Sequence, residues 1–423
     1  MRKTFFVIIA LSVAISSLSQ TRIKVMAYNL MHYPGSTYYN TATGNYESRA
    51  FALKDILDEY QPDIFMVSEL KNSAGANEIL SQSLATEDDR YQMAEFQNNH
   101  SSGYTELQQL VYYNSKKLIL TDQSYIVTNI RDINQYSFLI NTEPQINIEV
   151  FVAHLKAGNG VENEYKRLYM VEEFTDYLET IPDDTYVMIG GDFNFYSAYE
   201  LGYRELLDEE NSIRLVDPIN SYGAWHNNSD YTDIHTQSPL QSNWHFHSEF
   251  GGSEGVTGGL DDRFDFILIS ENIQDGDELT YVPDTYKAYG NNGNCFNGDI
   301  TDSDCDGEYS EYTRTLLHNM SDHLPVVMEL ETGTSVVTSN TSLTYNLNLI
   351  GSNYVNESIQ LNIGQNLIGK EIEIHNQLGQ LVLKQELVSE NQKISISHLN
   401  AGLYYFSCPQ ISLHSPLKFI IVD

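Results

Sequence analysis

The chain has 423 residues, which exceeds one ordinary domain and predicts a large unit with a smaller appendage. It carries 58 Asp and Glu against 23 Lys and Arg, a formal net charge of -35, and such a surface repels polyanions. This charge weakens the counterion-release binding that basic nucleic-acid proteins use, so a nuclease activity would depend on a metal and on local contacts. Three cysteines are too few for a disulfide-rich scaffold, although Cys295 and Cys305 could close a small loop and leave Cys408 alone.

The first residues are typical of an export signal. Arg2 and Lys3 form a basic segment, residues 5–15 are apolar, and residues 17–19 form a small-residue cleavage site before Gln20. An apolar run of about 11 residues is too short to cross a bilayer. No later stretch approaches the length of a membrane helix. We therefore predict a signal peptide over residues 1–19, secretion of the mature protein and no stable membrane span.

From residue 20 to residue 332 the sequence alternates strand-like and helix-like runs, which predicts a mixed α/β catalytic domain. Helices are expected over residues 47–60, where the apolar period stops before Pro62, and over residues 164–178, ahead of Pro182. Strands are expected over residues 25–28, 64–67, 110–113, 146–153, 186–189, 264–269 and 324–330.

The texture of the sequence changes after this domain. Residues 333–345 are rich in Thr and Ser and lack a sustained apolar period, so they are predicted to be a linker. Short alternating runs between turn signals then predict a small β-sandwich over residues 346–423. These runs cover residues 371–375, 380–384, 393–397, 402–406 and 418–422.

Six motifs in the first domain place a polar side chain next to an apolar, strand-like run. Four of these side chains follow their run and two precede it, so antiparallel placement of the last two strands would bring all of them to one rim. Carboxylate, amide and imidazole groups gathered in this way form a site for a hard divalent cation and a phosphate ester. In chain order the groups belong to Asn29, Glu69, His154, Asp192 with Asn194, Asp265, and Asp322 with His323.

The residue types suggest which groups bind a metal. Hard cations prefer carboxylate and amide oxygens, which makes Glu69, Asp322 and Asn29 the candidate ligands of Mg²⁺ or Mn²⁺. A lone motif of this kind is more often an ordinary turn or a satisfied polar residue. The interpretation therefore depends on the joint occurrence of all six motifs.

The remaining groups suit proton transfer. Asp192 and Asn194, two residues apart in a Gly-Asp-Phe-Asn turn, are expected to hold a water or a phosphate oxygen. Asp265 is expected to orient His323 and fix its tautomer. The base is either His323 or Asp192, and the near-neutral titration of an imidazole favours the histidine. His154 would face the phosphate from the other half of the site as the candidate acid.

This ordered set resembles the signature series of the endonuclease/exonuclease/phosphatase superfamily, the DNase I-like fold, over residues 22–330. The resemblance implies a four-layer α/β/β/α sandwich, a divalent metal and hydrolysis of phosphate esters. A histidine where His154 stands resembles the DNase I and sphingomyelinase branches. DNase I-like members pair that histidine with a glutamate ahead of a strand, and Glu106, ahead of the run at 110–113, is the nearest match.

We therefore expect a secreted, metal-dependent phosphodiesterase, and within that class a monomeric endonuclease that hydrolyses DNA or RNA. A phosphomonoesterase or a sphingomyelinase-type phosphodiesterase of the same superfamily is the alternative. A non-enzymatic binding or adhesion protein is disfavoured, because every expected catalytic position is filled.

The C-terminal unit resembles the type A sorting domain of the type IX secretion system of Bacteroidetes. The matching segments are residues 374–382, 399–404 and 418–420. The resemblance implies export through the type IX machinery to the cell surface or the medium. A small carbohydrate-binding or adhesive sandwich is the alternative, because a fold alone does not decide a function.

One acidic loop resembles half of a calcium-binding loop. Residues 302–307 place acidic oxygens at alternate positions and a glycine at the turn, but Thr313 stands where an EF-hand has its bidentate glutamate. An EF-hand is therefore not expected. A looser structural Ca²⁺ site and a solvated acidic loop both stay open, and the solvated loop is favoured.

Overall fold

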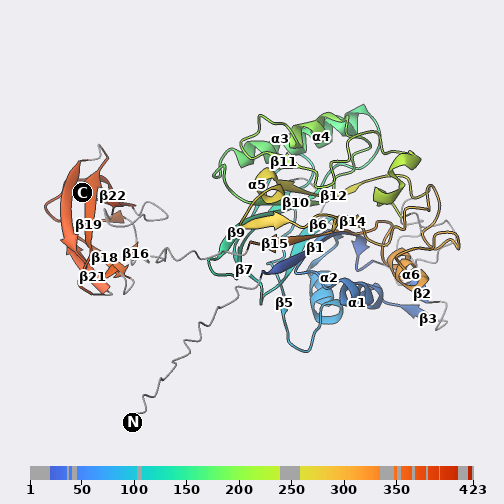
Figure 1. Ribbon diagram of the computed structural model, residues 1–423, viewed down its shortest axis with the longest axis horizontal. Helices are drawn as coiled ribbons and strands as arrows, with labels where there is room; N and C mark the ends of the chain where they lie inside the picture. The colour runs from blue at the N-terminus through green and yellow to red at the C-terminus, as the bar shows by residue number, and fades with distance from the viewer. Residues whose placement is uncertain are drawn as a thin grey trace, which may run out of the picture. The chain divides into compact units, whose positions relative to one another are not determined.

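The computed structural model describes residues 20–35, 38–40, 45–101, 107–238, 258–333, 347–349, 354–363, 367–377, 380–389, 391–407 and 418–421. Contacts divide the chain into two compact units, Met1–Ser335 and Val336–Asp423, which are described separately (Figure 1). The predicted signal peptide and nearly all of the predicted linker lie outside the described residues.

The first sheet of the large unit has two parallel strands at its centre, β1 and β4, and antiparallel neighbours on both sides. Strand β4 is almost continuously apolar and buried, as expected for a strand that is covered on both faces. The order is β13 (Leu279–Tyr281), β15 (Val326–Thr332), β1 (Arg22–Tyr33), β4 (Ile64–Leu70), β6 (Gln108–Asn114) and β5 (Tyr91–Met93), with β14 (Lys287–Ala288) also paired to β15.

The second sheet repeats this plan. Strands β9 and β10 are parallel, and β8 and β12 flank them in antiparallel orientation. The order is β11 (Leu215–Val216), β12 (Asp265–Ser270), β10 (Val187–Asp192), β9 (Ile146–His154), β8 (Ile133–Ile140) and β7 (Leu118–Ile126). The two sheets pack face to face, with β1 against β10 and β4 against β9.

Helices cover the outer faces of the two sheets (Figure 1). One apolar cluster fills the space between the sheets and reaches under α1, and a second lies between the other face of the second sheet and α3. The predicted four-layer α/β/β/α sandwich is confirmed. The helical segments are α1 (Arg49–Tyr60), α2 (Ser73–Glu78), η1 (Ile79–Ser83), α3 (Val161–Leu178), α4 (Leu201–Leu206), η2 (Ser229–Ile234), α5 (Glu271–Gln274) and α6 (Glu311–Met320). Strands β2 (Tyr38–Asn40) and β3 (Asn45–Glu47) pair with each other in antiparallel orientation.

The two predicted helices form close to their expected places. Helix α1 begins after Ser48, whose Oγ accepts a hydrogen bond from Ala50 N, and ends at Gln61 in the left-handed conformation, directly before Pro62. Strands β7 and β8 and helix α6 were not predicted. In β8 the buried Asn134 and Gln135 break the apolar pattern, because their amides find partners inside the fold.

The small unit is a β-sandwich, as predicted. A three-stranded sheet, in the order β16 (Leu347–Leu349), β18 (Ser358–Ile363) and β21 (Asn391–Ser395), packs with a five-stranded sheet around one apolar cluster. The five strands are β17 (Tyr354–Val355), β23 (Lys418–Ile421), β22 (Gly402–Ser407), β19 (Glu371–Asn376) and β20 (Leu381–Glu386). Across the described part of both units, the helices are too short or too polar to cross a membrane.

Candidate active site

The polar ends of six segments meet at one rim of the two central sheets. The carboxyl ends of β1 and β4 lie together because these strands are parallel, and the same holds for β9 and β10. Strands β15 and β12 run antiparallel to β1 and β10, so the residues that begin or precede them reach the same rim. The side chains brought to this rim are Asn29, Glu69, His154, Asp192, Asn194, Asp265, Asp322 and His323.

Asn29 lies between the carboxylates of the two sheets. Its Nδ2 donates to Glu69 Oε1 (3.1 Å) and to Asp192 Oδ2 (2.9 Å). Its Oδ1 accepts a hydrogen bond from Met31 N (2.9 Å), and this contact fixes the orientation of the amide. Asn29 therefore presents its amino group, and not its oxygen, to the centre of the site.

The turn after β10 holds Asp192 in place. Asn194 adopts a positive φ of 54°, and its backbone N donates to Asp192 Oδ1 (3.1 Å). Gly191 is required just before this turn, because a Cβ there would lie 2.0 Å from Ala153 O. Both oxygens of Asp192 are thus hydrogen bonded, one to Asn194 and the other to Asn29.

Asp265 and His323 form a buried pair, with His323 Nδ1 2.7 Å from Asp265 Oδ2. Thr236 holds the start of β12, since its Oγ1 accepts from the backbone N of Asp265 (3.1 Å). Burial lowers the pKa of His323, but the carboxylates of Asp265 and Asp192 together raise this pKa well above its usual value. The other ring nitrogen, Nε2, lies 3.8 Å from Asp192 Oδ2.

Asp192 also has a shifted pKa. Burial raises it to about 7, His323 opposes the shift, and the negative charges of Asp265 and Glu69 add to it. Two groups that interact this strongly exchange protons as one pair, so the acid-base behaviour of Asp192 and His323 belongs to both residues together.

His154 approaches the same carboxylates from β9. Its Nε2 lies 3.4 Å from Asp192 Oδ2 and 3.8 Å from Glu69 Oε1. Burial lowers the pKa of His154 well below its usual value, and the Arg131 guanidinium lowers it further. Arg131 also donates to the backbone oxygens of His154 and Leu155, which fixes the end of β9. Among the described residues, Nδ1 of His154 has no hydrogen-bond partner.

The donor groups at the rim fit a divalent cation. Glu69, His154 and Asp192 offer ligand atoms within 4.8 Å of one another, and Asp192, Asp265 and His323 do the same. The nearby Asp322 adds a fourth carboxylate, with its Oδ1 4.0 Å from His323 Nε2. Gathering so many carboxylates in a largely buried site is unfavourable without positive charge, and oxygen donors of this kind suit Mg²⁺ or Mn²⁺.

Comparisons with known proteins identify the C-terminal unit. Residues 353–422 match the family described as the secretion system C-terminal sorting domain. The C-terminal unit is a secretion sorting domain. No curated protein matches the chain.

Several solved structures are similar to this chain. They include the human nocturnin catalytic domain with a bound sulfate anion, at 16% identity and a TM-score of 0.44, covering 74% of this chain and 96% of that chain. D. rerio TDP2 complexed with a single-strand DNA product has 14% identity, a TM-score of 0.44 and coverages of 74% and 100%. An endonuclease/exonuclease/phosphatase from Bacteroides vulgatus has 11% identity, a TM-score of 0.43 and coverages of 74% and 99%.

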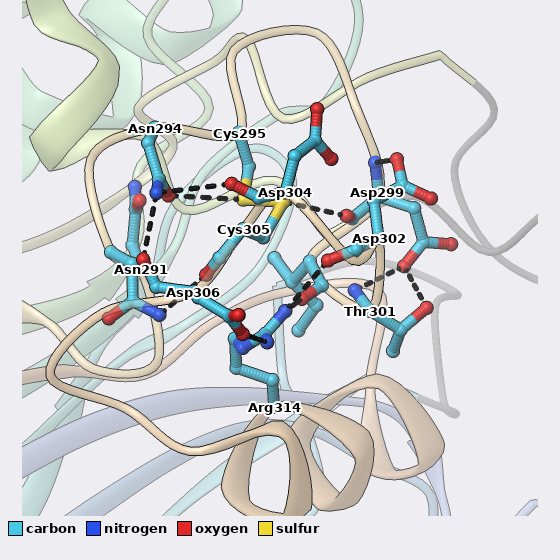
Figure 2. The surroundings of a disulfide bond; sticks show 12 residues. Asn291, Asn294, Cys295, Asp299, Thr301, Asp302, Asp304, Cys305, Asp306 and Arg314 are labelled. Carbon is cyan, nitrogen blue, oxygen red and sulfur yellow. Dashed lines mark hydrogen bonds and ion pairs between the residues drawn. A yellow bond between two sulfur atoms is a disulfide. The ribbon is translucent and has the colours of Figure 1, made fainter.

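Two further predictions concern loops. Glu106, the predicted partner of His154, lies outside the described residues. The acidic loop is closed by a disulfide between Cys295 and Cys305 (Figure 2). Arg314 reaches into this loop and donates to the backbone oxygens of Ile300 and Asp302 and, at 2.9 Å, to Asp306 Oδ1.

The contacts of Arg314 bear on the predicted Ca²⁺ site. Ca²⁺ is bound by carbonyl and carboxylate oxygens, and the guanidinium already uses three oxygens of these two kinds in the loop. Arg314 therefore brings positive charge to this loop. The structural Ca²⁺ site and the solvated acidic loop both stay predictions.

Sequence analysis did not identify Thr236 and Arg131, whose hydrogen bonds fix the backbone at Asp265 and His154. Thr236 and Arg131 lie in segments without a periodic pattern, and their partners, Asp265 and His154, are 29 and 23 residues away along the chain. Arg131 lies two residues before β8. The buried polar residues Asn134 and Gln135 interrupt the apolar pattern by which this strand would be recognised. No motif in the sequence could have indicated either residue.

Proposed function

We propose that the large unit is a metal-dependent phosphodiesterase that cleaves nucleic acids. The observation that carries this proposal is the meeting of the Asp265–His323 pair with Asp192, Glu69 and Asn29 at one rim of the fold. Cleavage of a phosphodiester needs charge neutralisation on the phosphate, an aligned water and an acid for the leaving oxygen. The rim offers a group for each of these requirements.

Glu69 and Asp322 are the proposed ligands of Mg²⁺ or Mn²⁺, because they are the less buried carboxylates at the rim. When bound, the cation would neutralise the charge that develops on the phosphate oxygens. For Asn29 we revise the role predicted from sequence. Since its oxygen accepts from Met31 N, we propose that Asn29 donates through Nδ2 and positions the carboxylates of Glu69 and Asp192.

The Asp192–His323 pair is the proposed acceptor of the proton from the attacking water. Asp192 is held at both oxygens, and Asp265 fixes the ring of His323, so a water placed between the pair meets a preorganised acceptor. The sequence left either His323 or Asp192 as the base. In this proposal the two residues share the proton, so both assignments describe the same pair. Asn194, whose backbone N holds Asp192 Oδ1, keeps this turn in the required conformation.

His154 is the proposed acid for the leaving oxygen. Burial favours its neutral form, but a phosphodiester anion next to Nε2 would favour the protonated ring. The ring lies on the side of Asp192 opposite to the Asp265–His323 pair, because β9 and β12 flank β10 on its two edges. An acid on one side and the base pair on the other match an in-line displacement at phosphorus.

A substrate panel tests the proposed function. Plasmid DNA, RNA, a bis-aryl phosphate, an aryl phosphate and sphingomyelin are each incubated with the protein under Mg²⁺, Ca²⁺ and EDTA. We expect cleavage of nucleic acid and of the bis-aryl phosphate under Mg²⁺ and its loss in EDTA. Turnover of sphingomyelin above that of DNA, or of the aryl monoester above both diesters, would move the enzyme to another branch of phosphate-ester hydrolysis.

Replacing His154 with alanine should reduce the cleavage of two kinds of diester to different extents. DNA and RNA have poor leaving groups, so loss of the acid is expected to reduce their cleavage by about 10²- to 10⁴-fold. A bis-aryl phosphate releases a phenolate that needs no proton, and its cleavage should fall far less. The measurement is kcat/KM for both substrates, with His375→Ala in the sorting domain as a control. Equal losses on the two substrates would remove His154 from the acid role.

We also propose that the sorting domain directs the enzyme through the type IX secretion machinery. The match of residues 353–422 to a secretion sorting domain supports this proposal. Deletion of residues 342–423 should leave hydrolysis intact in vitro but retain the protein in the periplasm of its own host. Fractionation and activity assays check both outcomes. An intact mass that shows the domain retained on freely secreted enzyme would instead indicate a binding module.

A further inference from the structure

Two half-exposed histidines outside the proposed catalytic set are each fixed by a buried aspartate. His100 Nδ1 lies 2.9 Å from Asp132 Oδ2, and His226 Nδ1 lies 2.7 Å from Asp262 Oδ1. Each histidine side chain is 45% exposed, whereas the aspartates are almost fully buried. Because Nδ1 is used in both pairs, Nε2 is the nitrogen left for a ligand, and within the described ranges neither Nε2 takes part in a hydrogen bond or an ion pair.

A tyrosine restrains each ring further. His100 stacks on Tyr125 with ring centroids 4.0 Å apart and the planes inclined by 5°. His226 contacts the ring of Tyr196 edge to face, with centroids 5.2 Å apart. A ring that is already held loses little conformational freedom when a ligand binds. Both imidazoles are therefore preorganised, although neither contributes to the core.

Short hydrogen-bonded links join both pairs to the proposed catalytic residues. Arg131, the neighbour of Asp132, donates to His154 O (2.8 Å). On the other side, Asp262 O accepts from Thr236 N (2.8 Å), and Thr236 Oγ1 in turn accepts from Asp265 N (3.1 Å). The two histidines thus belong to the same rim.

Strand register separates Asp132 from the strand that follows Asp262. Asn134 pairs with Val152, so Asp132, two residues earlier, lies level with His154 at the end of β9. His154 is level with Asp192, and Asp192 with Asp265. Three inter-strand steps of about 4.8 Å therefore separate Asp132 from Asp265, a distance of about 14 Å. Asp262 lies three residues before Asp265, where the chain continues beyond the start of β12 and alongside the segment that follows β10.

Positive charge is scarce in this chain, so the two imidazoles are important for binding a polyanion. Of 23 Lys and Arg, several arginines are buried and hydrogen bonded within the fold, so they cannot meet a substrate. Around them stand 58 Asp and Glu. A polyanion that reaches the rim therefore depends on a few well-placed cationic groups. The buried arginines are Arg49, Arg131, Arg167, Arg263 and Arg314.

We propose that His100 and His226 bind backbone phosphates on the two sides of the scissile phosphate, so that the substrate is a polynucleotide strand lying across the rim from β8 to β12. This inference rests on the proposed nuclease function and specifies its substrate. With Nδ1 facing an aspartate, Nε2 is the ring atom directed to the phosphate, and it donates an Nε2–H to a phosphate oxygen when the ring is protonated. At about 3.4 Å per stacked nucleotide, the row from Asp132 to Asp265 corresponds to about four nucleotides. A monoester or a lipid headgroup would not reach both rings.

Binding measurements test this inference directly. His100→Gln and His226→Gln are made singly and together in an Asp192→Asn background, which prevents turnover, and His375→Gln, also beside a carboxylate (Glu373), is the matched control. Fluorescence anisotropy follows single-stranded DNA and RNA of about eight nucleotides at mildly acidic pH over a range of salt. Loss of two phosphate contacts should weaken binding at least about tenfold and flatten the slope of log K against log salt by about 1.4.

The dependence of KM on substrate length distinguishes phosphate binding from a purely structural role of the two histidines. In the active chain, the double variant should raise KM for the eight-nucleotide strand more than KM for a dinucleotide or for a bis-aryl phosphate. Arginine at both positions should restore most of the affinity. An equal rise in KM for all substrates would overturn the inference. An unchanged slope of log K against log salt in a folded double variant would do the same. A wild-type chain that binds strands but cleaves none would instead overturn the nuclease function, and the variants would still decide the phosphate contacts.

Discussion

Replacing Glu69 with alanine is expected to reduce phosphodiester turnover by orders of magnitude while the chain stays folded. Glu69 ends strand β4 just beyond its buried apolar run, and its Oε1 and Oε2 accept from Asn29 Nδ2 and His32 N. Loss of a metal ligand removes several kcal/mol of transition-state stabilisation. The core beneath the rim does not use this carboxylate, so stability should change little. The measurement is kcat/KM over a Mg²⁺ titration together with a thermal melt.

Two further variants make this prediction specific. Glu69→Gln keeps the size of the side chain and removes only its charge, so it should lose nearly as much activity as alanine. Glu87→Ala removes an exposed acid in the turn before β5, near the opposite end of the first sheet, and should leave turnover unchanged. Near-normal activity of Glu69→Ala in the presence of EDTA would contradict the metal-ligand role.

The sequence revealed the parts of the fold that have a strong apolar period. Strands β1, β4, β9, β10, β12 and β15 are buried on both faces and read as short apolar runs, and each polar residue that interrupts such a run was visible. Their convergence at one rim could be predicted from strand direction alone. Strand β8 escaped because its buried amides, Asn134 and Gln135, are satisfied by partners that only the fold brings near.

Orientation within the site was beyond sequence reasoning. The predicted ligand role of Asn29 depended on residue type, whereas the hydrogen bond from Met31 N decides which end of the amide faces the carboxylates. The acidic loop is a similar case. Its spacing suggested a cation, but the sequence does not show that Arg314 folds back onto the loop oxygens. Both outcomes depend on single contacts that no periodic pattern encodes.

A buried ion pair directly behind the site yields the largest expected loss of stability. Arg263 is fully buried, donates to Asp217 through both Nη atoms (2.7 and 3.0 Å) and lies over the ring of Phe266, 4.2 Å from its centroid. Asp217→Ala would leave this guanidinium without a counter-charge in the protein interior. Removal of one partner of such a pair costs about 3–5 kcal/mol, so the free energy of unfolding should fall by that amount.

Denaturant unfolding and activity assays of the same variants separate the structural role of this pair from a chemical one. Since Arg263 lies two residues before Asp265, Asp217→Ala should also displace the start of β12 and lower turnover at temperatures where the chain is still folded. Glu308→Ala breaks the exposed pair with Lys287 and should cost less than about 1 kcal/mol. Leucine at both positions of the buried pair removes the unpaired charge, so the double variant should be more stable than Asp217→Ala alone. A single variant as stable as wild type would show that water reaches Arg263 and that the pair does not support the site.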